Sequence, residues 1–314
     1  MDKYIRGRFM AQGESITISP LGVRRSFKGL KTRGKHLDGV KRSTIKEWSK
    51  ASVRRLREEL FGYHLKGEEY LLGFTGTLPG NISKDFWKGY GDEFRKLMER
   101  FRISFKRRFP NSYLVYRVEL QQRGAPHIHA IVHFHKDDLL SDMGLKQSAV
   151  TPSAVGMAAF DIKRLWLDSV DLDSMPDRRA IDDWRFKQYG AKTESVNREG
   201  MMRYLCDHAS KRKQVQLGWR GRQWGVFCRE NRVRYDELTL PSEVMASPRL
   251  VAQFMRMVRR LQRYRQLCDC QFGSRLVGGR RETGVIFLGE GAVAGLKRWV
   301  SAALASRPSA HPQS

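Results

Sequence analysis

A carboxylate and two imidazoles are spaced along the chain so that they can bind one metal ion. Glu119 precedes the turn residues 123–126, and His127 and His129 follow them. If the flanking segments are antiparallel strands and the turn is centred near Arg123, Glu119 lies opposite His127, with a Cβ separation of about 5 Å. Alternation along the strand places His129 on the same face. Two imidazoles and a carboxylate bind a divalent metal and leave positions open for a substrate.

The residues around this group predict the strands that hold it. Residues 113–121 alternate between two faces, and Glu119 shares its face with Arg117. In 127–135, an apolar face formed by Ile128, Ala130, Val132 and Phe134 lies opposite a face that carries four histidines. For His133 and His135, which lie further from Glu119, we expect partial exposure or nucleic-acid contact. The alternative is that all four histidines are only the polar side of a half-exposed strand.

Glu119 followed by His127-Ile128-His129 resembles the metal motif of the HUH endonucleases. The flanking pattern is similar to that of rolling-circle replication initiators from filamentous and small single-stranded-DNA phages and related plasmids. Three stretches carry the resemblance, namely Tyr70–Pro79, Glu119–Phe134 and Gly200–Gly225. It implies an α+β protein with the HUH nuclease fold, in which helices flank a central antiparallel sheet. It also implies an enzyme that nicks one DNA strand with a tyrosine and stays attached to the 5′ phosphate.

Tyr204 is the candidate nucleophile. A helix is expected from about residue 198 to 214, and on it Tyr204, His208 and Lys211 lie on the side opposite the apolar residues. A tyrosine on the polar side of a rigid helix is placed to react with a substrate, although an exposed tyrosine without a role has the same pattern. The pKa of a tyrosine, about 10, requires help from the metal or from a base, for which His208 and Lys211 are candidates.

The Tyr204 helix departs from the pattern of the family it resembles. That pattern is Tyr-x-x-Lys, often with a second tyrosine four residues after the first. Here Asp207 stands at the lysine position and His208 at the second-tyrosine position, while Lys211 is retained one turn further on. A single nucleophile is therefore expected. A literal Tyr-x-x-Lys also occurs at Tyr189, but its surroundings predict a strand.

The net charge of +26 predicts a polyanionic partner. No apolar run reaches the length of about 20 residues that a membrane span needs, and the first ten residues lack the apolar core of a signal peptide. Residues 218–225 form a basic and aromatic stretch suited to phosphate contact and base stacking, with Trp219, Arg220, Arg222 and Trp224, although Trp224 also suits a core. The candidate DNA-binding residues are Arg123, Arg220, Arg222, Trp224, Arg256, Arg259, Arg260 and Arg263, of which the last four lie on one side of a helix expected at 249–267.

The expected cofactor is Mg²⁺ or Mn²⁺, although two imidazoles also suit Zn²⁺ or Fe²⁺. The expected partners are single-stranded and origin DNA together with a host helicase and polymerase, in the cytoplasm of a bacterial host. The alternatives are a DNA-binding regulator that does not cleave, an HUH enzyme of the relaxase or transposase type, and a metal hydrolase or oxygenase of small molecules.

The chain is expected to divide into four parts. These are a basic N-terminal arm and helix (1–66), a nuclease core (67–228), a basic and mostly helical C-terminal region (229–305) and a disordered tail (306–314). Within them, periodicity predicts helices at 50–63, 84–108, 154–170 and 292–304, and strands at 70–78, 184–196 and 283–288. The helix at 154–170 is expected to turn Phe160 inward, and 136–152 is expected to be a loop.

Overall fold

The structure is a computed structural model. It describes residues 14–27, 50–78, 91–121, 126–140, 149–170, 190–195, 223–268 and 284–306, and the single residues 179, 182 and 184. These residues form two compact units. The first contains 14–27, 57–62 and the described residues from 235 onward, and the second contains 50–56 and the described residues of 63–234.

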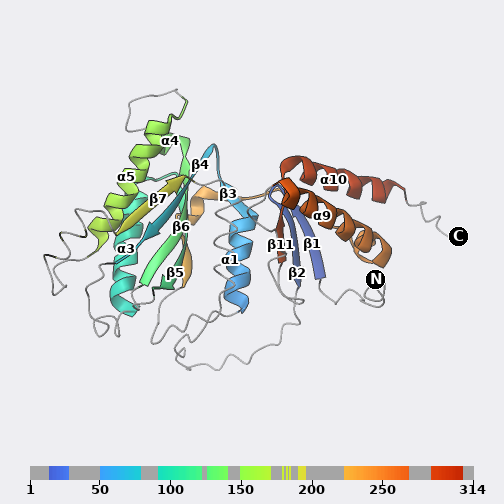
Figure 1. Cartoon of the computed structure of the whole chain (residues 1–314), viewed down its shortest axis with the longest axis horizontal. Helices are drawn as coiled ribbons and strands as arrows, with labels where there is room; N and C mark the ends of the chain where they lie inside the picture. Colours follow the sequence, from blue (N-terminus) through green and yellow to red (C-terminus); the bar gives the residue numbers. More distant parts are fainter. Residues whose placement is uncertain are drawn as a thin grey trace. The chain divides into compact units, whose positions relative to one another are not determined.

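A five-stranded antiparallel sheet forms the centre of the second unit (Figure 1). Its order is β7-β4-β6-β5-β8, so the three longest strands lie in the middle and the two short ones at the edges. The strands are β4 (Glu69–Gly76), β5 (Tyr113–Leu120), β6 (Pro126–His135), β7 (Ala191–Ser195) and β8 (Trp224–Phe227). The α+β class and the central antiparallel sheet flanked by helices are thereby confirmed.

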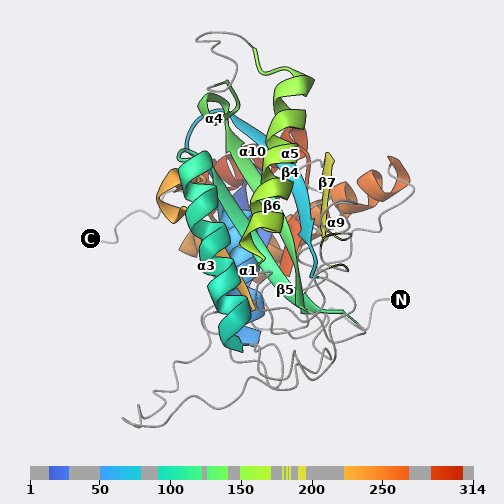
Figure 2. The same cartoon turned by 90° about the vertical axis from the view of Figure 1, so that its left-hand side faces the viewer.

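Two helices cover one face of this sheet, as Figure 2 shows for α3 (Gly91–Arg108) and α5 (Pro152–Ser169). Phe101 of α3 contacts Phe74 of β4 and Phe227 of β8, with ring centroids 5.8 Å apart in both pairs. Trp166 of α5 lies edge-on to Phe101 at 5.4 Å. Burying each of these side chains stabilises the fold by about 1.5–3 kcal/mol, so this aromatic core holds the sheet.

A glycine on β4 makes room for the α5 tryptophan. A Cβ atom at Gly76 would lie 2.6 Å from Trp166 Cε2, which is too close for any other residue without movement of the ring. Trp166 Nε1 also donates a hydrogen bond of 3.0 Å to the Thr77 carbonyl oxygen, which satisfies its polar atom in the core. The two interactions fix α5 against β4.

A short helix follows β6 where the sequence predicted a loop. This helix, α4 (Lys136–Leu140), places the buried carboxylate of Asp138 beside the start of β5. Asp138 accepts hydrogen bonds from the Asn111 backbone N–H at 3.0 Å and from Ser112 Oγ at 2.5 Å. The prediction failed because this helix is stabilised by groups that lie 26 and 27 residues away in sequence.

Two further predictions in this unit are wrong in part. Phe160 was expected in the core, but it is 54% exposed, because Trp166 and Ile162 occupy the inner face of α5. The strand predicted at 184–196 is shorter, since β7 begins at Ala191 and Trp184 is helical. The Trp184 ring is buried and lies where a Cβ atom at Gly190 would stand. Its apolar character therefore reflects packing rather than a strand.

Apart from one helix, the remaining elements between β2 and β10 are short. The helix α1 (Lys50–Gly62) was predicted at 50–63, and its residues Leu56, Leu60 and Phe61 are buried. β3 pairs antiparallel with β9, with Tyr63 opposite Arg234. These elements are β3 (Tyr63–Leu65), β9 (Arg232–Arg234) and the 3-10 helix η2 (Arg229–Asn231).

A four-stranded sheet organises the first unit, with the order β10-β1-β2-β11. Its strands are β1 (Glu14–Ser19), β2 (Gly22–Phe27), β10 (Leu238–Thr239) and β11 (Gly284–Phe287). A basic arm was expected at the N-terminus, and within it the described residues 14–27 form a hairpin that pairs with C-terminal strands on both sides. The alternation of Ile16 and Ile18 with polar residues is typical of a strand, but the strands that pair with this hairpin lie far away in the sequence.

Three helices pack against this four-stranded sheet, namely α8 (Ser242–Met245), α9 (Pro248–Cys268) and α10 (Glu290–Ala305). Phe254 and Val258 of α9 and Leu296 of α10 are buried with Ile16 and Ile18 of β1. The predicted helices at 249–267 and 292–304 and the strand at 283–288 correspond to α9, α10 and β11. The tail 307–314 lies outside the described residues.

Substituting Gly76 tests the packing of α5 on β4. We expect Gly76→Ala to lower the free energy of unfolding by about 1–3 kcal/mol, because the new methyl group meets the Trp166 ring. Gly156→Ala is the control, since a Cβ atom there meets nothing within 4 Å. As a glycine inside α5, its replacement should stabilise by about 0.5–1 kcal/mol. Urea unfolding measures both, and equal effects would contradict the packing.

Candidate metal centre

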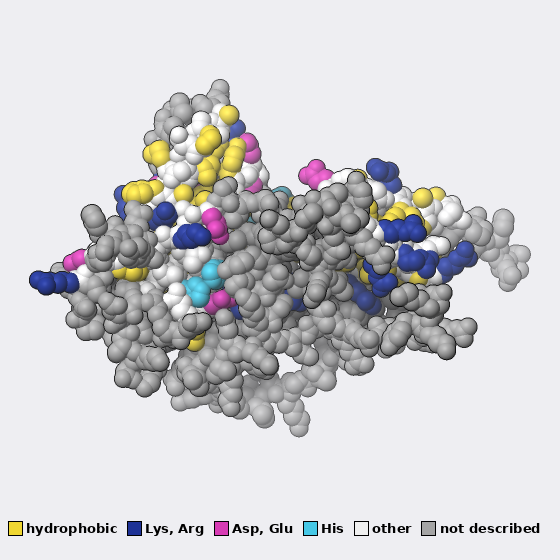
Figure 3. All heavy atoms as spheres, in the orientation of Figure 1, with side chains coloured by type: hydrophobic (Ala, Val, Ile, Leu, Met, Phe, Trp, Pro, Cys, Tyr) yellow, Lys and Arg dark blue, Asp and Glu magenta, His cyan; other side chains and the backbone are white. Residues whose placement is uncertain are grey.

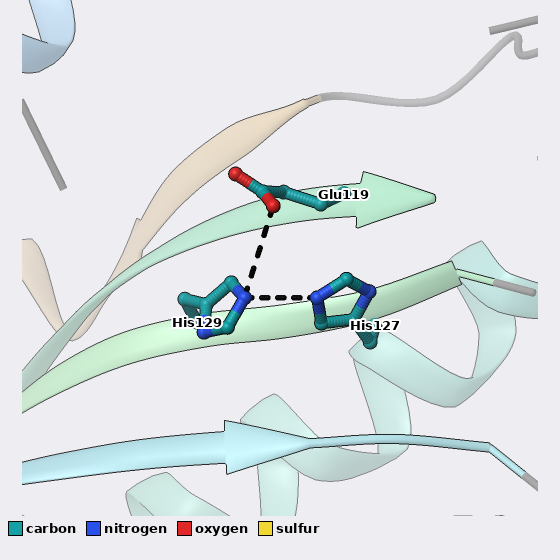
Figure 4. Close-up of side chains that lie close together, drawn as sticks. All are labelled: Glu119, His127 and His129. Atoms are coloured by element: carbon teal, nitrogen blue, oxygen red, sulfur yellow. Dashed lines mark hydrogen bonds and ion pairs between the residues drawn. The ribbon is translucent and has the colours of Figure 1, made fainter. Parts of the chain in front are cut away.

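The pairing of β5 with β6 brings the predicted metal ligands together. Glu119 is directly opposite His127, as the sequence predicted, and His129 is opposite Arg117. Figure 4 shows the three side chains on the same side of the sheet and pointing toward one another. His127 Nε2 lies 2.8 Å from His129 Nε2, and His129 Nε2 lies 3.8 Å from Glu119 Oε2.

The donor atoms of this cluster fit a divalent ion. One ligand atom from each of Glu119, His127 and His129 lies within 4.8 Å of the others. Glu119 and His129 are buried, whereas His127 is half-buried, so the cluster is embedded in the sheet and open on one side. Three protein ligands with an accessible side are the arrangement of a catalytic rather than a closed structural site.

Thr75 of β4 orients one of the imidazoles. It is paired with His129 across the sheet, and its Oγ1 lies 3.2 Å from His129 Nδ1. With Nδ1 bonded to the hydroxyl, the opposite nitrogen Nε2 is the one directed at Glu119 and His127. Such a partner on the second nitrogen fixes the ring and the tautomer of a metal-binding histidine. The role of Thr75 could not be predicted from the sequence, because it depends on the pairing register of β4 with β6.

Arg117 is the second residue that the sequence analysis missed. Its side chain is fully buried, and its Nη1 lies 3.1 Å from Glu119 Oε1. It shares a row across the sheet with His129 of β6 and Trp224 of β8. The sequence could have indicated this role, because Arg117 lies two residues before Glu119 and therefore on the same face of the strand. Apart from these two residues, the strand is apolar.

The two other histidines of β6 do not join the cluster. His133 was expected to be partly exposed, but it is buried and stacks on Tyr113 with ring centroids 4.0 Å apart. Its Nδ1 lies 2.7 Å from Glu69 Oε1. His135 is half-buried, and its Nδ1 accepts a hydrogen bond from the Asp137 backbone N–H at 3.2 Å. His133 therefore contributes to packing and not to an exposed nucleic-acid surface.

Comparison with known protein families gives an independent view of this part of the chain. Residues 74–213 match the model of a family of replication-associated proteins, of the ORF2 type. The matched stretch contains Glu119, His127, His129 and Tyr204 and ends just after Lys211. No curated protein matches the chain, and no solved structure matches it. The match confirms a similarity to replication-associated proteins, as the sequence motifs implied, over the middle of the chain.

The other predicted site residues fall into two groups. Trp224 is half-buried at the start of β8, directly opposite Arg117, so it lies on the face of the sheet that carries the cluster. Arg123, Tyr189, Tyr204, His208, Lys211, Arg220 and Arg222 lie outside the described residues.

Cys228 is a thiol close to this unit's core, but it is not poised to react. It is buried at the end of β8, and burial, reinforced by the charge of Glu230, raises the pKa of the Cys228 thiol to about 11. A thiol with this pKa is protonated at neutral pH and is a poor nucleophile. It is a free cysteine.

The arginines predicted on α9 are exposed. Arg256, Arg259 and Arg260 face away from the apolar side formed by Phe254 and Val258. Figure 3 shows Lys and Arg side chains gathered over α9 and α10. Arg263 belongs to the same helix, but its side chain is not among those that the structure describes. Among the helices that the structure describes, none has the length and apolar character needed to cross a membrane.

Replacing Thr75 tests the orientation of His129. We expect Thr75→Val to weaken Mn²⁺ binding by about 10–100-fold, since the isosteric side chain leaves His129 Nδ1 without its hydroxyl partner. Thr193→Val on β7 is the matched control, because Thr193 is paired with Phe74 and so lies on the other face of the sheet. Isothermal titration calorimetry measures both affinities. Equal affinity of the two variants would show that Thr75 does not orient the ring.

Proposed function

We propose that this chain is a rolling-circle replication initiator with the HUH nuclease fold, a metal-dependent endonuclease and strand transferase for single-stranded DNA. The observation that carries the proposal is the convergence of Glu119, His127 and His129 within residues that match a replication-associated family. The net charge of +26 supports a nucleic-acid substrate. A small-molecule hydrolase or oxygenase with the same ligands would leave this charge without a role.

The reaction is an exchange of one phosphodiester for another. The Tyr204 hydroxyl oxygen attacks phosphorus, a bond forms between this oxygen and the 5′ phosphate, and the bond to the 3′ oxygen breaks. The proton leaves Tyr204 and the 3′ oxygen takes up a proton, with His208 or Lys211 as the group that assists. The 3′ hydroxyl then primes synthesis, and the reverse reaction rejoins the strand without ATP because the bond energy is kept.

Glu119, His127 and His129 would hold the divalent ion, for which Mg²⁺ or Mn²⁺ is our choice. When bound there, the ion would polarise the scissile phosphate and offset charge in the transition state. The cluster lies on the face of the β5–β6 pair that is opposite the aromatic core, and Trp224 on the same face is suited to stack on a base near the scissile bond. DNA, a host helicase and a host polymerase are the partners that such an initiator requires.

The nucleophile is tested by mapping the covalent adduct. The protein is incubated with Mn²⁺ and labelled single-stranded DNA carrying the origin of the replicon that encodes it, and is then separated on a denaturing gel. Tyr204→Phe should eliminate the adduct without loss of stability or Mn²⁺ binding, whereas the matched variant Tyr189→Phe should retain it.

Replacing both His127 and His129 with Ala should abolish nicking and reduce DNA affinity only modestly, because dispersed Lys and Arg supply most of that affinity.

Mass spectrometry of the nuclease-trimmed adduct identifies the attachment site. A nucleotide on a residue other than Tyr204 would overturn the assignment of the nucleophile and leave the nicking activity standing. Salt-dependent DNA binding with no adduct on any residue would favour the alternative, a regulator that binds DNA without cleaving it. Full nicking by the double histidine variant in a chelator would show that the metal assignment is wrong.

The arginine face of α9, defined by Arg256, Arg259 and Arg260, is proposed as a duplex-DNA surface of the first unit. Replacing the three with Gln should reduce the slope of log affinity against log salt by about 0.9 for each phosphate that is no longer neutralised. The control variant replaces the exposed residues Arg95, Lys96 and Arg107 of α3, which removes the same charge elsewhere. Fluorescence anisotropy with duplex origin DNA measures the slope, and an equal change in both variants would contradict a specific surface on α9.

A further inference from the structure

We propose that Arg117 is the built-in counter-ion of the metal centre, so that it stabilises Glu119 when no metal is bound and lowers the affinity for the metal. This inference rests on the metal site of the proposed function. It assigns to Arg117 a role that the motif Glu119, His127 and His129 does not contain. Arg117 is a positioning residue in this account, since it acts on the metal through Glu119.

The position of Arg117 carries the argument. Its guanidinium is fully buried on β5, an inner strand of the sheet, and Nη1 is 3.1 Å from Glu119 Oε1. The other oxygen of the same carboxylate, Oε2, is the one 3.8 Å from His129 Nε2. Arg117 and a metal ion would therefore approach Glu119 from its two different oxygens. A buried arginine is costly unless it is paired, so this charge is retained against a strong cost of desolvation.

Arg117 has two opposite effects on metal binding, orientation of the carboxylate and repulsion of the cation. The ion pair with Oε1 orients the Glu119 carboxylate. This orientation favours metal binding by a free energy no larger than the rotamer entropy of one side chain. By carrying a positive charge beside a divalent cation in a buried site, Arg117 opposes binding through Coulomb repulsion at short range. In a site of low effective dielectric constant, that repulsion is the larger effect. Removing the arginine should therefore tighten metal binding rather than weaken it.

The charge balance explains what such a residue does for the reaction. Without metal, the charges of Arg117 and Glu119 cancel, so a buried carboxylate is present without a net buried charge. When a divalent ion is bound, the charges of Arg117 and Glu119 still cancel, so the ion adds its charge to a neutral pair and these three groups together are cationic. A phosphodiester anion is the kind of substrate that such a site attracts. Arg117 therefore lowers the affinity for the metal, and it also keeps the site positively charged once the metal is bound.

The test measures Mn²⁺ binding in the absence of DNA. We expect Arg117→Met to bind Mn²⁺ at least about tenfold more tightly than the unaltered chain, whereas Arg117→Lys, which keeps the charge, should stay within about threefold. Arg108→Met is the control, because Arg108 is a half-buried arginine paired with a carboxylate, Asp161, at 2.6 Å between α3 and α5. It should leave Mn²⁺ affinity unchanged although it removes an ion pair of similar kind.

Thermal unfolding gives a second readout. In a chelator, Arg117→Met should unfold at a lower temperature than the unaltered chain, because Glu119 loses its counter-ion. Saturating Mn²⁺ should raise the unfolding temperature of this variant by more than that of the unaltered chain, since the ion then replaces the arginine. Arg117→Gln, which is neutral but keeps a hydrogen-bond donor, should behave in the same direction if Arg117→Met proves hard to purify.

The outcomes separate this inference from the proposed function. Unchanged or weaker Mn²⁺ binding in Arg117→Met overturns the counter-ion role and leaves the metal site standing, and weaker binding would assign Arg117 to orientation alone. Failure of both Arg117→Met and Arg117→Gln to fold in saturating Mn²⁺ also overturns it, because the ion would then be unable to replace the arginine. If the variant with both His127 and His129 replaced by Ala binds Mn²⁺ like the unaltered chain, the metal site itself is wrong.

Discussion

One pairing register, that of β5 with β6, determines where the candidate metal ligands lie. It sets Glu119 opposite His127 and Arg117 opposite His129. A shift by one residue would send one strand's polar side chains into the aromatic core, because side chains alternate between the two faces. The packing of Phe101 and Trp166 on the opposite face therefore stabilises the register, and with it the geometry of the candidate metal centre.

Local patterns explain why the centre of the fold could be predicted. The apolar and polar faces of 127–135 alternate except at Ile131, which lies on the histidine face, and the Gly124-Ala125-Pro126 turn before them limits the possible registers to a few. The helix α9 was equally accessible, since its apolar stripe and its arginine side follow helical spacing over 21 residues. In both segments the residues that define the pattern are close together in sequence, so no tertiary information was needed.

The features that could not be predicted depend on partners far away in sequence. Thr75 and Arg117 acquire their roles only when β4 and β5 are both paired with β6. His133 is buried because Tyr113 and Glu69, from two other strands, surround it. Phe160 is apolar yet exposed, and only the packing of Trp166 shows which side of α5 faces the sheet. Periodicity within one segment contains none of this information.

The four-stranded sheet of the first unit has a consequence for how the chain is made. Its central hairpin, β1 and β2, is synthesised before its outer strands β10 and β11, which leave the ribosome after the whole five-stranded sheet. An isolated two-stranded hairpin is at best marginally stable, and its open edges invite association with other chains. The first unit is thus the last to be completed during translation. A fragment designed to contain only the second unit must therefore lack both the N-terminal and the C-terminal part of the first unit. Removing only one of these parts would leave two strands of the four-stranded sheet without their partners.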